Sequence, residues 1–327
     1  MHRRALFSSL GTAIPATLAG CAGFGTPGGR SAVGRLPTAT LELTAVTDAD
    51  LPARVLYTVG PDEVSNRQMQ LMERVLDGGD TVEATRPPLP ARRDVLFDGT
   101  VYRLTHETVE TTPATWYEVK VDVVTGTVSD SERIRFGDLP AVDRAAFARH
   151  GLADGETVGV GTTFLYTAAQ REQSALVPRS NYSVVVWPDG SRAEWVVDGA
   201  TDTTLNAYHY TAERVASAAE YGRRMRERFA FALSNLSDAQ RHVVETAISE
   251  GRYVVHRDAT PSAAFTSLVE RFRGREQVHA LDTAGEGDLN GRYLVRYADG
   301  CYLATLGVYG DAFRTATSAS TTTTGGS

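Results

Sequence analysis

The sequence predicts an α+β fold in which helices pack on antiparallel sheets built from about three degenerate strand–helix–hairpin units. Two observations carry this prediction. A capped-helix motif occurs twice, and an Asp-Gly pair stands between two strand-like runs three times. Hydrophobic residues make up 42% of the 327 residues, which is enough for a substantial core. The length fits one large domain or two smaller ones.

The capped-helix motif begins at Ser65 and again at Ser237. In each copy Ser-x-x-Gln predicts a capping box, in which the serine oxygen and the glutamine side chain each accept a backbone N–H. Apolar residues follow at helical spacing, and Gly79 and Gly251 stand where a helix ends in the left-handed conformation. The copies align without a gap over 15 positions. A fainter third copy, which lacks the box, begins at Leu139.

Each motif is followed by a predicted hairpin, because Asp and Gly tolerate positive φ between two strands. The three turns are Asp98-Gly99, Asp189-Gly190 and Asp299-Gly300. We therefore expect three units, near residues 40–105, 117–198 and 206–308. The alternative is that such hairpins, which are common, recur by coincidence, since the units differ in length.

Two further helices are expected. Thr211 can cap a run with an apolar stripe through Leu233, and Thr260-Pro261 can open a second helix that ends before Gly274.

The N-terminus has the pattern of a secretory signal peptide, residues 1–20. Arg3 and Arg4 precede a mild apolar run that is too short to span a bilayer, and Leu18-Ala19-Gly20-Cys21 follows. The arginine pair is typical of twin-arginine export, a route that carries folded proteins. The ending predicts that the Cys21 sulfur takes a lipid and becomes the mature N-terminus. The alternative is an N-terminal helix that ends in this tetrapeptide by chance.

Residues 1–21, together with the composition, resemble the twin-arginine-exported lipoproteins of haloarchaea. His2 stands where the family usually has Ser or Thr. The resemblance implies a location on the outer face of the cytoplasmic membrane, with a lipid on Cys21 as the anchor. It implies no activity, because the family is defined by its export and lipidation signal.

The remaining chain divides by composition. Residues 21–36 form a Gly-rich flexible tether, residues 37–310 form the α+β body, and residues 311–327 form a Thr/Ser/Gly-rich tail that we expect to be disordered.

The charge excludes a nucleic-acid partner. The formal net charge is −7, and removing residues 1–20 takes away two arginines and no acid. Lys120 is the only lysine, so the other 32 cations are arginine. An acidic, lysine-poor chain fits concentrated salt, and a GC-rich genome explains the arginines equally well. Cys301 is the only other cysteine and is expected to be a buried strand residue.

Two candidate sites stand out in the body. Arg223, Arg224, Arg226 and Arg228 crowd one helix and can contact an anion such as a phosphate headgroup or a glycan carboxylate. The alternative is a solvated face on which neighbouring glutamates pair with these arginines. Asn181 begins a glycosylation sequon that ends at Ser183, whereas the sequon at Asn235 overlaps the helix cap.

No sequence motif predicts catalysis, a metal or a cofactor. The sequence contains no His-Glu-x-x-His helix, no Gly-x-Ser-x-Gly elbow and no P-loop lysine. We therefore expect a non-catalytic binding or envelope-interaction module whose partner is a surface protein or a glycan. The alternatives are a secreted hydrolase-like enzyme and a transporter-associated solute receptor, either with a site that sequence does not reveal.

Overall fold

The computed structural model describes residues 37–124, 128–155, 159–257, 259–283, 289–309 and 313. The predicted signal peptide, the tether and the residues Arg3, Arg4 and Cys21 lie outside the described residues. The predicted tail does too, apart from Phe313.

The helices of the described chain are short. They are α1 (Leu51–Val55), α2 (Asn66–Leu76), α3 (Ala141–Arg149), α4 (Ala168–Gln173), α5 (Ala218–Phe229), α6 (Asp238–Ser249), α7 (Ala263–Val269) and the 3-10 turns η1 (Asp130–Glu132) and η2 (Phe136–Asp138). Within the described chain, none of these helices has the length and apolarity to cross a membrane.

The strands form two mixed sheets. They are β1 (Ala39–Ala45), β2 (Tyr57–Val59), β3 (Asp80–Ala84), β4 (Arg93–Phe97), β5 (Thr100–Val123), β6 (Arg133–Arg135), β7 (Val160–Thr167), β8 (Val184–Val186), β9 (Arg192–Ser217), β10 (Ala230–Ala232), β11 (Arg252–Val255), β12 (Gly291–Tyr297) and β13 (Gly300–Val308). One sheet has the order β10-β12-β13-β1-β11. The other has the order β2-β4-β5-β9-β8-β6, with β3 on β9 and β7 on β5.

The α+β class is confirmed, but the expectation of purely antiparallel sheets is wrong. β2 pairs parallel with β4, β6 with β8, and β10 with β12. In each case the connection contains a helix and a strand of opposite direction, β3, β7 or β11, which returns the chain to the end of the sheet from which it started. Such a crossover makes the two strands parallel.

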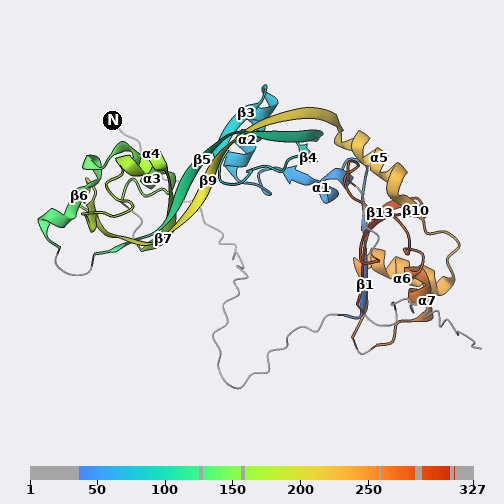
Figure 1. Ribbon diagram of the computed structural model, residues 1–327. Helices are drawn as coiled ribbons and strands as arrows, with labels where there is room; N and C mark the ends of the chain where they lie inside the picture. The colour runs from blue at the N-terminus through green and yellow to red at the C-terminus, as the bar shows by residue number, and fades with distance from the viewer. Residues whose placement is uncertain are drawn as a thin grey trace, which may run out of the picture.

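A long two-stranded ribbon runs through the molecule (Figure 1). β5 has 24 residues and β9 has 26, and they pair from Thr100 opposite Ser217 to Val123 opposite Ala193. At roughly 3.3 Å per residue the ribbon is about 80 Å long. The helix predicted from Thr211 is therefore wrong at its start, because Thr211 pairs with Thr105 in the ladder and Ser217 caps α5.

Both predicted capping boxes are confirmed, at Ser65 and at Ser237. The third predicted turn is shifted by one residue, because β13 already begins at Gly300 and Ala298 has the positive φ of 49°. Phe313 lies in the segment predicted to be a disordered tail, but it is buried and packs against Phe265.

The hydrophobic clusters divide the molecule. At one end of the ribbon a cluster consists only of residues between 117 and 197; we call the described residues between 114 and 199 the distal lobe. The cluster under α6 and α7 instead combines β1 with residues 231–313, and the cluster under α2 combines residues 59–104 with the C-terminal part of β9. A fourth cluster, around α1 and α5, joins these two regions, which we call the proximal body.

Candidate binding surface of the distal lobe

Strand β6 forms the outer edge of the eight-stranded sheet. It pairs with β8 on one side, and no described strand pairs with its other side. Side chains alternate along a strand, so Ile134 enters the core while Arg135 faces solvent. The strand therefore presents charged groups beside an open edge.

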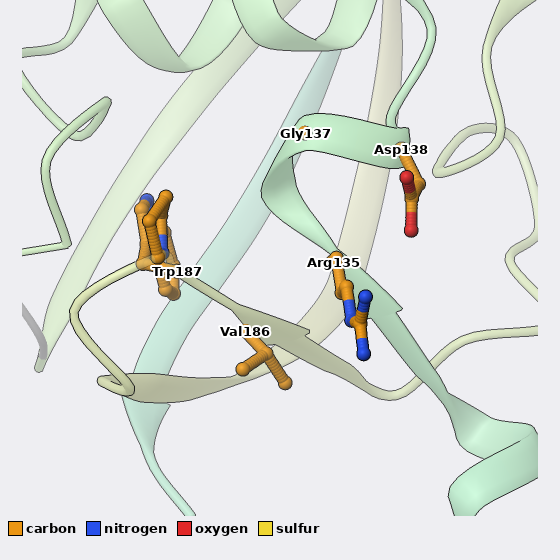
Figure 2. A pocket seen from close by; sticks show the side chains of 6 residues that line it. Arg135, Gly137, Asp138, Val186 and Trp187 are labelled. Carbon is orange, nitrogen blue, oxygen red and sulfur yellow. The ribbon is translucent and has the colours of Figure 1, made fainter.

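Three hollows adjoin this edge. The first, of about 350 Å³, lies between η2 and the end of β8, and Figure 2 shows Arg135 and Asp138 on one side of it and Val186 and Trp187 on the other. The second, of about 500 Å³, shares Arg135, Asp138 and Val186 with the first and adds Tyr182. The third, of about 470 Å³, shares Tyr182 with the second. We call this continuous region the β6 surface.

The charges of the β6 surface are partly unpaired. The Arg133 guanidinium binds the Asp130 carboxylate at 2.9 Å. Arg135, Asp138 and Arg179 are exposed and have no hydrogen-bond or ion-pair partner among the described side chains. Free guanidinium and carboxylate groups beside an aromatic ring are able to bind a polar ligand by charge-assisted hydrogen bonds.

The floor of the surface is rigid. Trp187 is buried, and its Nε1–H donates to the Leu152 carbonyl at 3.1 Å. Phe136 stacks on the Trp187 ring, with 5.9 Å between centroids, and Phe147 meets it edge-on. Gly155 contacts the same ring so closely that a Cβ there would lie 2.7 Å from it. A packed aromatic base of this kind holds the surface in one shape.

A buried polar network below the surface is structural. The Asp143 carboxylate accepts hydrogen bonds from the Tyr166 hydroxyl at 2.9 Å, the Ser174 hydroxyl at 2.6 Å and the Ala175 N–H at 2.8 Å. Burial raises the pKa of Tyr166 far above its usual range. Because Asp143 is fully buried, this network ties the segment before β8 to α3 and has no access to a ligand.

The four arginines of α5 lie in the proximal body, each next to a carboxylate. Arg223 pairs with Glu227 at 2.9 Å, Arg224 with Glu220, Arg226 with Asp48 at 2.7 Å and Arg228 with Glu276 at 2.8 Å. This arrangement favours the ion-paired helix face over a site for an external anion.

The other singled-out residues are scattered. Cys301 is half-buried in β13, and burial raises the pKa of its thiol. Asn181 is exposed at the rim of the third hollow. Among the residues that the structure describes, no three His, Cys, Asp or Glu side chains gather as a metal site would need.

Sequence reasoning missed the β6 surface. Its residues follow no motif, and the only local signal is the alternation Arg133-Ile134-Arg135, which is typical of a half-buried strand. No family model, no curated protein and no solved structure matches the chain.

Proposed function

We propose that the chain is an exported, lipid-anchored surface protein that acts as a non-catalytic binding or envelope-interaction module, with the distal lobe as its binding head. The export signal at Arg3 and Arg4 and the lipid on Cys21 remain the basis of the location on the outer face of the cytoplasmic membrane. The partner is a surface protein or a glycan.

One observation carries the assignment of the head. The three hollows described above all lie in the distal lobe, whereas the tether leads into β1 of the five-stranded sheet. In this proposal the tether joins the lipid to the proximal body. The ribbon of about 80 Å then holds the distal lobe away from the membrane.

We also propose that the body consists of three successive repeats, near residues 40–105, 117–198 and 206–308. In support, the five strands around each of the helices α2, α3 and α6 have one order and one set of directions. These orders are β2-β4-β5-β9-β3, β6-β8-β9-β5-β7 and β10-β12-β13-β1-β11. In each set the first pair is parallel and the others are antiparallel.

The third residue of each of these helices supports the same proposal. Gln68 donates to the Pro88 carbonyl at 2.7 Å, Gln240 donates to the Ser267 hydroxyl at 3.1 Å, and Asp143 accepts from Ser174 and Ala175. In all three units this side chain therefore ties the helix to the segment that precedes the hairpin.

The repeats differ in where their first strand lies. β1 lies between β13 and β11 of the third repeat, and the C-terminal part of β9 lies between β5 and β3 of the first repeat. The first and third repeats thus exchange strands. The second repeat keeps its own first strand, because the C-terminal part of β5 lies between β9 and β7.

The anchoring part of the proposal is tested by the substitution Cys21→Ala in the full chain. We expect the wild-type protein to carry a lipid on the Cys21 sulfur by mass spectrometry and to sediment with membranes, and the variant to be found outside the membrane fraction. Cys301→Ala is the matched control and should stay anchored. A Cys21→Ala variant that sediments with membranes as the wild type does contradicts the anchor.

A further inference from the structure

The two sequons of the body lie in different structural settings. Asn181 belongs to an irregular segment between α4 and β8 in the distal lobe, and Asn235 belongs to the turn between β10 and α6 in the proximal body. Both asparagines are exposed. Exposure alone therefore does not distinguish them, and the surrounding hydrogen bonds do.

The side-chain acceptor groups of the sequon at Asn181 are free, whereas the Ser183 backbone is hydrogen-bonded to neighbouring segments and Tyr182 packs against the distal core. Neither the Asn181 amide group nor the Ser183 hydroxyl takes part in a hydrogen bond within the described chain, and both groups line the third hollow. The turn before them is held by the Ser180 hydroxyl, which accepts the Tyr182 N–H at 2.9 Å. An acceptor amide and a hydroxyl at the third position are thus presented together on the surface, as transfer of a glycan requires.

The groups of the sequon at Asn235 are already hydrogen-bonded or buried in the folded chain. The Ser237 hydroxyl accepts the Gln240 N–H at 3.3 Å as the N-cap of α6, and Leu236 is buried in the core. The Asn235 carbonyl accepts a hydrogen bond from Arg271 at 3.2 Å, and Asn235 has a positive φ of 54°. Recognition there would require the loss of the cap and the extraction of Leu236.

We propose that Asn181 carries an N-linked glycan and that Asn235 does not, an inference that rests on the proposed export of the chain. In the transfer, the Asn181 Nδ2 attacks the anomeric carbon of an oligosaccharide linked to a lipid phosphate. The C–O bond to the phosphate breaks, the lipid phosphate leaves with the electron pair, and the amide loses one proton. Because twin-arginine export delivers folded chains, the folded geometry decides which sequon reacts.

A glycan at this position has a consequence for the head. Asn181 stands at the rim of the third hollow, whose lining includes Tyr182 and Trp195. The first hollow, beside Arg135 and Asp138, shares no lining residue with the third and stays open, whereas the second hollow shares Tyr182 with it. The glycan therefore restricts the binding surface to the part next to β6.

The test compares two tryptic peptides of the full chain, purified from the membranes of a salt-adapted archaeal host that has an N-glycosylation pathway. Cleavage after arginine gives residues 180–192 with Asn181 and residues 229–241 with Asn235. We expect mass spectrometry to find a glycan on the first peptide and none on the second. Asn181→Gln and Ser183→Ala should abolish the modification, whereas Ser183→Thr and Asn235→Gln should retain it.

A second arm separates this inference from the export proposal. The purified, folded full chain is incubated with transferase-containing membranes and the lipid-linked oligosaccharide, so that the reaction does not depend on export. Glycan on Asn181 in this reaction supports the inference even if Cys21 carries no lipid in cells. An unmodified Asn181 in this reaction, or a glycan on Asn235 in either arm, overturns it.

Discussion

The distal lobe and the proximal body are built from similar elements but close their cores in different ways. The distal core uses only residues between 117 and 197. The two proximal cores each need strands from the opposite end of the chain, β1 in one and the C-terminal part of β9 in the other. The comparison teaches that the distal lobe closes its core by itself, whereas the proximal body is one interlocked unit.

The largest expected effect concerns independent folding. A fragment of residues 114–199 should fold by itself, because β6, β7, β8 and the adjoining parts of β5 and β9 all lie within it. A fragment of residues 37–105 should not, because it lacks the C-terminal part of β9, which lies between β3 and β5, and its β1 has no partner. Circular dichroism and thermal unfolding of both fragments in strong salt show whether each one folds. A folded 37–105 fragment would contradict the difference between the two regions.

The next effect compares one helix position in the two regions. Asp143→Ala should lower the free energy of unfolding by about 3–5 kcal/mol, because it leaves one buried and two part-buried hydrogen-bond donors without their acceptor. Gln240→Ala at the matching position should lower it by about 1 kcal/mol, because it removes one side-chain hydrogen bond and one part of a capping box. Denaturant unfolding measures the free energy of unfolding of both variants. An equal loss of stability in the two would contradict the expected difference between the two positions.

A third effect concerns the contact between α5 and the turn before α1 in the proximal body. A Cβ added at Gly222 would lie 1.8 Å from the Asp48 carbonyl oxygen. Gly222→Ala should therefore lower the free energy of unfolding by about 1–3 kcal/mol. Gly137 of the distal lobe has no neighbour within 4 Å of an added Cβ, so Gly137→Ala should change the free energy by less than about 0.5 kcal/mol. A Gly222→Ala variant with an unchanged free energy of unfolding would mean that α5 and Asp48 are not closely packed.

The smallest effect is the pH dependence of the same contact. Hydrogen bonding and proximity to the Arg226 guanidinium lower the pKa of Asp48. A lowered carboxyl pKa contributes stability above the unfolded value of about 3.8, and this stability is lost as the pH falls through the folded value. Melting temperatures measured between pH 5 and pH 2 should therefore fall less for Asp48→Asn than for the wild type.

Whether an element of the fold can be predicted from sequence depends on how far apart in the sequence its interacting residues lie. The capped helices at Ser65 and Ser237 were predictable because a capping box needs only four neighbouring residues. The extension of β9 through Thr211 was not, since its partner Thr105 is 106 residues away. The parallel pairs and the pairing of β1 with β11 and β13 are likewise long-range, and local propensity does not report on them.

The candidate site follows the same rule. Cys21 and Asn181 stand in short motifs and could be singled out from sequence alone. Arg135, Asp138 and Tyr182 form one surface only because β6 and β8 pair and the segment before β8 folds beside them. The arginines of α5 show the converse: they crowd together in sequence, yet the structure gives each a carboxylate partner.

The most direct test of the proposed binding head uses the full chain in whole cells. A photo-crosslinking amino acid is introduced at Arg135 on the β6 surface, or at His242 on the exposed side of α6 in the proximal body. We predict a discrete adduct with a surface protein or glycan from position 135, none from position 242, and a roughly tenfold weaker yield when Asp138→Ala is added to the first variant. Adducts from position 242 with none from position 135 would contradict the assignment of the distal lobe as the head.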